Sequence, residues 1–499
     1  MSLVNLELEN FKKFSNLSLD LSQPITLIYG ENSSGKTSAI RALLSLMQTF
    51  SIQNKHHMLN AHGEYVDIGF YKDYIKDHNT KNRLGIAFTS DDFDTLHAKR
   101  TRSRKILTTH KLCYDYDADS SQSRLSSFTE TVTHSKLSEL IPKIHSSYGI
   151  EDFTDTVEAF KFSRLKTRSY FNYSVHPLAY LAIYQAWDRY SKNIDNIIQR
   201  RPKTVHLQQK FAIQATQQSS YDESENIGRH IFRRSMDQID RLFSSLYYLG
   251  PLRMTPFRSY KISTQTSSVG INGENTPIAL SRLHSMAQKD KSAKKLSKQK
   301  FENFTSWFEM IFPGRSVSAE PNEDVVRLKI NNSERSDSIA DVGFGFSQVL
   351  PILVQAAAMD PGETLIIEQP ELHLHPRAQV AFANFLTAAS RQGIKFIIET
   401  HSEHILKGLQ LNISNTTSKA KGHKEDLNLS CDSLKIYYFH KDDSHDLMKL
   451  NQWGEIEGGW PSGFFDESYH ISSKIVRNKI KGMSASRGQT KPRSPEDKK

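Results

Sequence analysis

The sequence predicts an α/β protein with a mainly parallel sheet that helices cover on both faces. Three continuous apolar runs of strand length support this prediction: ITLIYG from residue 25, TLIIEQ from residue 364 and IKFIIETHS from residue 394. Strands that are apolar on both sides are typical of parallel sheets, whose two faces are buried by helices. Segments with apolar residues at helical spacing follow the first two runs, as in strand–helix–strand units.

Length and composition narrow the possible classes of protein. A chain of 499 residues predicts one large domain with insertions or two to three domains. The formal net charge of +10 favours phosphates, nucleic acid or an acidic partner. Two cysteines far apart, Cys113 and Cys431, predict neither a disulfide framework nor a zinc ladder, and the chain shows no leader and no membrane-length apolar run. We therefore expect a cytoplasmic protein with no membrane contact.

Changes of pattern along the chain divide it into four parts. Residues 1–125 contain the first strands and one strand–loop–helix unit, with further strand character expected in EYVDIGFYKDYI and RLGIAFTS. Residues 126–245 read as helices with polar spacers and are expected to form a helical insertion. Residues 246–470 resume the sheet pattern at SLYYLGPLR. Residues 471–499 are basic and poor in apolar side chains, so we expect a disordered tail.

A complete phosphate-loop pattern, GENSSGKT, lies between the first buried strand and its helix. Its glycines let several backbone amides converge on an anion at the positive end of the helix. Lys36 is expected to reach the β and γ phosphates, and the hydroxyl of Thr37 to bind Mg²⁺. The sequence therefore predicts a nucleotide site made by Gly30, Glu31, Asn32, Ser33, Ser34, Gly35, Lys36 and Thr37.

Acidic and polar residues follow the later apolar runs. Glu368 ends one strand and is expected to hold Mg²⁺ as a carboxylate. The next residue, Gln369, can orient a water molecule but cannot take its proton. Glu371 is the nearest alternative acid, and His401 after the next strand could sense the γ phosphate.

A second glycine-containing segment, DVGFGFSQVLPIL, precedes an apolar helix. Small residues and free helix-terminal amides at Gly343, Gly345, Ser347 and Gln348 predict a second anion-binding surface. One molecule has no need of two such surfaces. Two molecules facing each other do, because each can close the nucleotide of its partner.

Three other features carry weaker functional interpretations. The lysine and arginine runs at 99–105 and 289–300 are candidate nucleic-acid contacts, although solvated faces are the commoner reading. His373 and His375 lack a third ligand of convincing spacing for zinc. Asp442 and Asp443 would suit a two-metal nuclease, but their place between two strand-like segments favours a hairpin turn.

In this motif order the sequence resembles the ABC-type ATPase heads of the structural-maintenance-of-chromosomes, recombination-repair and overcoming-lysogenization-defect groups. LELENFKKFSNLSLDL, the phosphate loop, GFGFSQVLP, IIEQPELHLHP and IIETHSEHIL carry the resemblance. YLGPLR and GEIEGGWPSGFFDE are similar to bacterial AAA-type ATPases, several of which act in antiphage systems such as Septu. The resemblance implies a phosphate-loop NTPase fold, with Gly343 to Gln348 as the signature, Glu368 as the Walker B acid and His401 as the switch histidine. It gives the family's glutamine loop no fixed position between Gln48 and Asp73.

The function implied by this resemblance is ATP hydrolysis with ATP and Mg²⁺ as cofactors. Such heads pair around two ATP molecules, so we expect a homodimer or higher oligomer that acts as a switch or clamp for a separate effector such as a nuclease, in antiphage defence. Because Gln369 stands where a catalytic glutamate is usual, we expect slow or partner-dependent turnover. The alternatives are a self-sufficient DNA nuclease and a DNA-repair ATPase.

Overall fold

The computed structural model describes most of the first and last thirds of the chain and less of its middle. The described residues are 1–50, 58–93, 105–134, 156–165, 168–173, 235–253, 255–262, 268–289, 294–419, 424–459, 461, 471 and 473–479. Every structural statement below concerns these residues.

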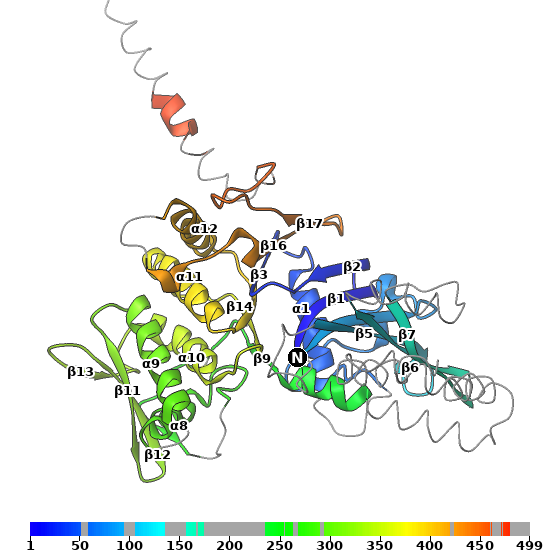
Figure 1. The fold of residues 1–499 in the computed structure, drawn as a ribbon, viewed down its shortest axis with the longest axis horizontal. Coiled ribbons are helices and arrows are strands. Elements are labelled where there is room, and N and C mark those ends of the chain that lie inside the picture. Colours follow the sequence, from blue (N-terminus) through cyan, green and yellow to red (C-terminus); the bar gives the residue numbers. More distant parts are fainter. Residues whose placement is uncertain are drawn as a thin grey trace, which may run out of the picture.

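A six-stranded sheet forms the centre of the molecule (Figure 1). Five neighbouring strands are parallel, and the edge strand β17 is antiparallel to β16. The order is β17 (His445–Met448), β16 (Leu434–Phe439), β3 (Ile25–Gly30), β15 (Lys395–Glu399), β14 (Thr364–Glu368) and β9 (Leu246–Leu249). The predicted mainly parallel sheet is confirmed, as is the predicted hairpin of the last two strands.

Both faces of this sheet are buried, which explains the continuous apolar runs. In β3, Ile25, Leu27 and Tyr29 enter one hydrophobic core, whereas Ile28 enters the other. Alternate side chains of a strand point to opposite faces, so a strand covered on both sides is apolar throughout. The first core is covered by α8 (Thr276–Lys289), α9 (Lys294–Ile311), α10 (Phe344–Ala358), α11 (Pro376–Arg391) and α12 (Glu403–Ser418).

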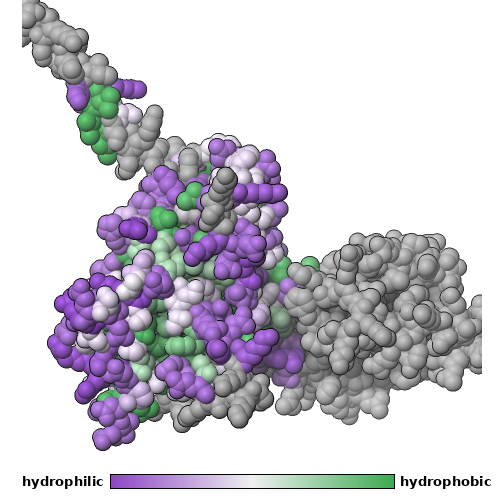
Figure 2. All heavy atoms as spheres, turned by 60° about the vertical axis from the view of Figure 1, so that its left-hand side comes forward, coloured by the Kyte–Doolittle hydropathy of each residue, from purple (hydrophilic) through white to green (hydrophobic). Residues whose placement is uncertain are grey.

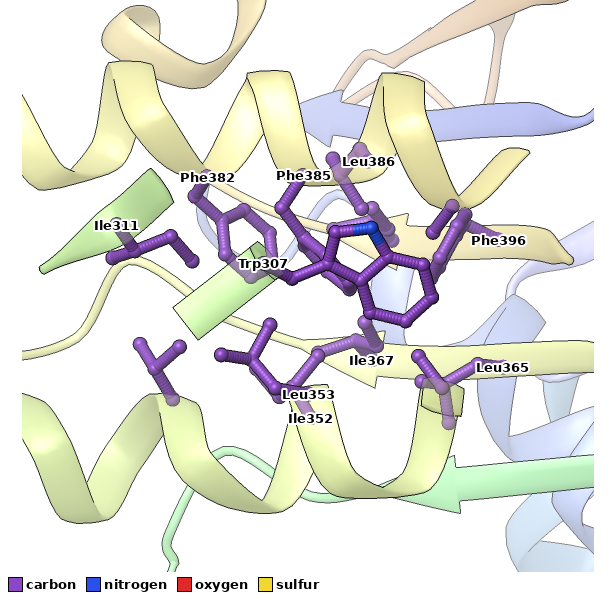
Figure 3. Close-up of a cluster of buried hydrophobic side chains, with 14 of the residues drawn as sticks. Trp307, Ile311, Ile352, Leu353, Leu365, Ile367, Phe382, Phe385, Leu386 and Phe396 are labelled. Atoms are coloured by element: carbon purple, nitrogen blue, oxygen red, sulfur yellow. The ribbon is translucent and has the colours of Figure 1, made fainter. Parts of the chain in front are cut away.

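Trp307 of α9 lies at the centre of the first core. Figure 3 shows its indole between α10, α11 and the strands, with Phe385 and Phe396 beside it. The rings of Trp307 and Phe385 meet edge to face with centroids 5.3 Å apart. Aromatic side chains bury large areas and favour this geometry, so the contact fixes α9 against α11.

The second core joins the parallel sheet to an antiparallel sheet through α1 (Lys36–Phe50). The seven strands follow the order β2-β1-β4-β5-β6-β7-β8. Their bounds are β1 (Ser2–Phe11), β2 (Phe14–Asp20), β4 (Leu84–Phe93), β5 (Lys105–Asp117), β6 (Gln122–His134), β7 (Thr156–Leu165) and β8 (Arg168–Tyr173). Because α1 contributes residues such as Ile40 and Leu43 to this core, it lies between the two sheets.

The expectation of a helical insertion over 126–245 is wrong for its described strands. Residues 126–134 belong to β6, and β7 and β8 extend the same antiparallel sheet. Only residues 235–244 of the described part are helical. An antiparallel sheet is held by main-chain hydrogen bonds and can have one face in water. Its strands can therefore carry many polar side chains and need not show the continuous apolar runs of the parallel strands. The remaining residues of the range lie outside the described part.

Two further expectations need correction. Strand character was expected in residues 64–75, but Tyr71–Tyr74 form the short helix α2. The amide of Phe70 donates to the carboxylate of Asp73 at 2.8 Å, and this capping interaction starts a helical turn. In the tail, residues 473–479 are helical, so the expectation of disorder is wrong there.

A smaller antiparallel sheet accompanies α8 and α9 at the edge of the helical side. It contains β10 (Tyr260–Lys261), β11 (Ser316–Asn322), β12 (Val325–Asn331) and β13 (Ser336–Ser338). The surface of this side is mainly hydrophilic, with a paler band through its middle (Figure 2). Within the described part of the chain, no helix is long and apolar enough to cross a membrane.

Candidate nucleotide site

The phosphate loop connects β3 to α1 at the carboxyl edge of the parallel sheet. Two glycines in it have no room for a side chain. A Cβ on Gly30 would lie 2.3 Å from the carbonyl oxygen of Phe439, and one on Gly35 would lie 2.6 Å from the ring of Phe14. Both glycines also have positive φ angles, which L side chains rarely adopt. The sequence therefore needs glycine at both ends of the turn.

Lys36 lies at the start of α1, and its side chain curls back over the loop. Its ammonium group donates to the carbonyl oxygens of Gly30 and Glu31, at 2.8 and 2.6 Å. Burial lowers the pKa of Lys36, while Glu399 and Glu31 act in the opposite direction. A buried cation at the mouth of a helix N-terminus suits a polyanionic ligand.

Two carboxylates meet at the ends of neighbouring strands. Glu368 closes β14 and Glu399 closes β15, and they are partners in the parallel register. Tyr248 donates its hydroxyl to Glu368 Oε1 at 2.9 Å, and Thr37 donates to Glu399 Oε1 at 3.0 Å. Burial raises the pKa of Glu368. Burial and the charge of Glu368 raise the pKa of Glu399 to about 7.

A main-chain hydrogen bond to the end of β15 fixes the start of the loop after β14. The amide of Gln369 donates to the carbonyl oxygen of Glu399 at 2.7 Å, and Gln369 has a φ of 45°. This left-handed conformation is uncommon for a side chain larger than glycine. The hydrogen bond holds the turn at the carboxyl edge, next to the two carboxylates.

Glu371 connects this loop to the segment after β15. Its Oε2 accepts from the hydroxyl of Thr400 at 2.7 Å, and its Oε1 accepts from the amide of His401 at 2.7 Å. Both carboxylate oxygens therefore have protein donors. The geometry makes Glu371 a brace between the two loops.

His401 precedes the last helix that packs on the sheet. Its side chain is exposed, and partial desolvation together with the charge of Lys36 lowers its pKa. Ser402, the next residue, caps α12 by accepting from the amide of Ile405 at 3.0 Å. The cap and the Glu371 contact together set the position of the His401 main chain.

The second predicted anion surface lies at the start of α10. Gly343 is the residue before the helix, and a Cβ on it would meet no atom within 4 Å. Ser347 and Gln348 are buried in the first two turns, and Phe344 is exposed with its ring 5.9 Å from that of His373. A Cβ on Gly345 would lie 3.2 Å from the carbonyl oxygen of His373. These contacts run to the 371–375 loop, whereas the phosphate loop contacts Phe14, Phe439 and Glu399.

Three observations indicate that the loop can bind a nucleoside triphosphate together with a hard cation. Ser34 is fully buried, and its hydroxyl has no partner among the described residues. Glu399 Oε2 is in the same situation. The backbone at Gly30 and Gly35 is bare of side chains. Buried polar atoms normally have hydrogen-bond partners, so unpaired ones at a loop of this kind indicate a ligand.

Three residues of this site were not found by sequence reasoning. Glu399 ends an apolar strand as Glu368 does, so the same signal was present for it. Arg253 is 7% exposed and donates from Nη2 to the carbonyl oxygen of Glu368 at 2.9 Å, while its Nε and Nη1 have no partner in the described part. Burial lowers the pKa of Arg253 to about 10. Tyr248 and Arg253 begin and end the segment YLGPLR, which contributes to the family resemblance, but the resemblance assigned neither residue a role.

Both aspartates in the turn of the last hairpin contact other protein groups. Asp442 accepts from the amide and hydroxyl of Ser444, at 3.2 and 2.6 Å. Asp443 pairs with Lys13 at 3.1 Å and with Lys76 at 3.8 Å. Across the described ranges, no three His, Cys, Asp or Glu side chains are grouped so that they could hold a metal ion. The predicted hairpin turn is confirmed, and it borders the phosphate loop.

The remaining sequence features have structural partners or fall outside the described part. His375 caps α11 by accepting from the amide of Arg377. Gln48 is buried in α1, and its amide group donates to the carbonyl oxygens of Asn60 and Val66, so it supports a neighbouring loop. The basic run at 99–105 lies almost entirely outside the described residues. In the 289–300 run, Lys298 and Lys300 pair with Glu302 and Asp360.

Fold and site together define a phosphate-loop α/β protein with a nucleotide site at the carboxyl edge of its parallel sheet. The model of the family described as "AAA ATPase domain" matches residues 1–406. The chain therefore belongs to the AAA ATPase domain family, and the protein is an ATPase.

A relative and several solved structures are similar to the chain. Over 107 residues the chain is 33% identical to the DNA replication and repair protein RecF of Pseudoalteromonas translucida (strain TAC 125). The match covers 21% of this chain and 29% of RecF, so it spans less than a third of that relative.

The solved structures are head domains of Smc proteins. An Smc head bound to the C-winged helix domain of ScpA is 11% identical with a TM-score of 0.42, covering 90% of this chain and 98% of that one. An Smc head with an extended coiled coil bound to the C-terminal domain of ScpA, from Pyrococcus furiosus, is 11% identical with a TM-score of 0.37, covering 95% and 99%. The SMC head domain from Thermotoga maritima is 10% identical with a TM-score of 0.35, covering 90% and 100%.

Proposed function

We propose that the protein binds ATP on residues 30–37 and hydrolyses it slowly. Backbone amides of the loop and Lys36 hold the phosphates, while Thr37 and Glu368 provide oxygen ligands for Mg²⁺. When bound, Mg²⁺ neutralises the charge that develops on the phosphate oxygens. His401 follows the end of β15 and would contact the γ phosphate. The observation that carries this proposal is the bare glycine loop facing the carboxylates of β14 and β15.

Slow turnover follows from the residues around the attacking water. Gln369 orients water through its amide but cannot accept a proton. Glu371, the nearest alternative base, uses both of its oxygens to hold Thr400 and His401. A general base contributes about 10²- to 10⁴-fold to rate, so its absence prolongs the ATP-bound state.

We place the ATP-bound state in a homodimer or higher oligomer. Gly343, Gly345, Ser347 and Gln348 lie in the first turns of α10, where Gly343 and Phe344 are exposed and Ser347 and Gln348 are buried behind them. Helix N-termini attract anions through free amides and the helix dipole. In the proposed dimer this surface of one protomer closes the nucleotide of the other.

The proposed role of the ATP-bound dimer is that of a switch or clamp for a separate effector such as a nuclease. The resemblance of YLGPLR and GEIEGGWPSGFFDE to antiphage ATPases supports a role in phage defence. We propose that the protein acts in the cytoplasm. The second candidate is a DNA-repair ATPase, and the similarity to RecF favours it. Turnover stimulated severalfold by DNA in the absence of any other protein would select the second candidate.

The test of the ATP site is Lys36→Ala. We expect ATP affinity to fall at least tenfold, because the only lysine of the phosphate loop is removed. Binding of a fluorescent ATP analogue to the full chain measures this, with circular dichroism to check folding. Lys407→Ala removes an exposed lysine that pairs with Glu403 on α12, and it should bind the analogue as the natural protein does. Equal affinity of both variants would contradict the assignment.

A further inference from the structure

A second acidic side chain lies at the edge of the sheet where ATP is proposed to bind. Glu368 and Glu399 end two neighbouring parallel strands in register. Parallel neighbours are about 4.8 Å apart, so both carboxylates reach the same space beyond the strand ends. Their exposed fractions are 7% and 3%. Water therefore has little access to either charge.

The hydrogen bonds of Glu399 leave one oxygen unused. Oε1 accepts from the hydroxyl of Thr37 at 3.0 Å. Oε2 is buried and has no partner among the described residues. The nearby ammonium of Lys36 donates to two main-chain carbonyls of the loop. A buried carboxylate oxygen without a donor or a cation is costly, so this arrangement favours a positively charged ligand.

The chemistry of the surrounding groups selects the class of cation. Two carboxylates and a threonine hydroxyl are hard oxygen ligands, which suit Mg²⁺ or Mn²⁺. Mg²⁺ sites next to phosphates commonly use one or two carboxylates and complete the octahedron with water and phosphate oxygens. The Thr37 hydroxyl is the group of a phosphate loop that binds such a cation. Glu399 Oε1 already contacts this hydroxyl.

We infer that Glu399 is a ligand of the divalent cation that accompanies ATP, so that the site has two protein carboxylates, Glu368 and Glu399. The inference rests on the proposed ATP site and extends it by one metal ligand. Glu399 is also the anchor of the loop after β14, because its carbonyl oxygen accepts from the amide of Gln369. Metal ligation at Glu399 therefore links the cation to the residue that orients water.

The experiment measures Mn²⁺ binding to the full chain by electron paramagnetic resonance, with a saturating non-hydrolysable ATP analogue. Glu399→Gln keeps an oxygen that can accept from Thr37 but removes the negative charge. We expect it to bind Mn²⁺ about 10- to 100-fold more weakly, the range found when groups supporting a metal are lost. Glu399→Ala, which removes both the charge and the acceptor, should weaken binding at least as much.

A role in positioning Thr37 alone gives a different pattern. In that case Glu399→Gln keeps the Mn²⁺ affinity of the natural protein and only Glu399→Ala loses it, which overturns the inference. Natural affinity in both variants overturns it as well. Glu302→Gln, an exposed carboxylate on α9 that pairs with Lys298, is the matched control and should change Mn²⁺ affinity less than twofold.

Analogue binding in EDTA separates this inference from the proposed function. If the natural protein binds no analogue with or without metal, the proposed ATP site fails. If it binds the analogue with Mn²⁺ and Glu399→Gln does so equally well, only the metal ligand fails. Thermal unfolding of each variant shows whether it is folded during these measurements.

Discussion

Gln369 is the residue on which the rate of the proposed reaction depends most. Its main-chain amide donates a hydrogen bond to the carbonyl oxygen of Glu399, and its main chain adopts a left-handed conformation. The side chain therefore starts from a defined point at the carboxyl edge of the sheet. The side-chain amide of Gln369 can hold a water molecule in place, but it cannot accept the proton of that water.

Gln369→Glu is expected to raise turnover at saturating ATP by about 10-fold or more, because a carboxylate of the same length can act as a general base. Phosphate release by the full chain measures this effect. Gln392→Glu, at the exposed end of α11, makes the same chemical change away from the site and should leave turnover unaltered. Equal turnover in Gln369→Glu and the natural protein would show that water activation lies elsewhere.

Sequence reasoning at this scale found the residues that belong to known patterns. The phosphate loop was predicted from its glycines and lysine, and Glu368 from its place at a strand end. Glu399 has the same local pattern, but its contact with Thr37 depends on β15 lying between β3 and β14, which only the strand order shows. Arg253 follows β9 and contacts Glu368 at the end of the neighbouring strand β14, so its contact depends on the strand order in the same way.

Among the elements, the buried parallel strands were predictable, and so was β4 in RLGIAFTS, but β6, β7 and β8 of the same antiparallel sheet as β4 were not. The strands β3, β14 and β15 are apolar on both faces and are recognised by composition alone. In β6 the sequence QSRLSSFTETVTH has few apolar residues, and those at Leu125 and Phe128 are buried. Its many threonines favour strands, but the polar side chains conceal the pattern. The strand was therefore misread as part of a helical segment.

Trp307 on α9 is expected to contribute strongly to the stability of the fold. Trp307→Ala is expected to lower the free energy of unfolding by about 3–5 kcal/mol, because it leaves a cavity between α9 and α11. Urea denaturation followed by circular dichroism measures the change. Leu296→Ala on the same helix, where the side chain is 59% exposed, should change it by less than about 0.5 kcal/mol. Similar losses in both variants would contradict the packing.

At the scale of the whole molecule, two sheets enclose α1, which begins at the phosphate loop. The helix that begins at the phosphate loop therefore packs on the antiparallel sheet on one side and on the parallel sheet on the other. The segment 343–348, the proposed signature, lies at the start of another helix, α10. In the proposed dimer, ATP joins this segment of one protomer to the phosphate loop of a second.

The most direct test of this claim is the mass of the full chain in solution, measured by light scattering with and without ATP and Mg²⁺. We expect ATP to double the mass of a 57.1 kDa protomer. Gly343→Glu should still bind ATP yet remain a monomer, because a Cβ there meets no described atom within 4 Å and the longer side chain adds bulk and negative charge to the facing surface. A mass unchanged by saturating ATP, or dimers of Gly343→Glu, would contradict the account.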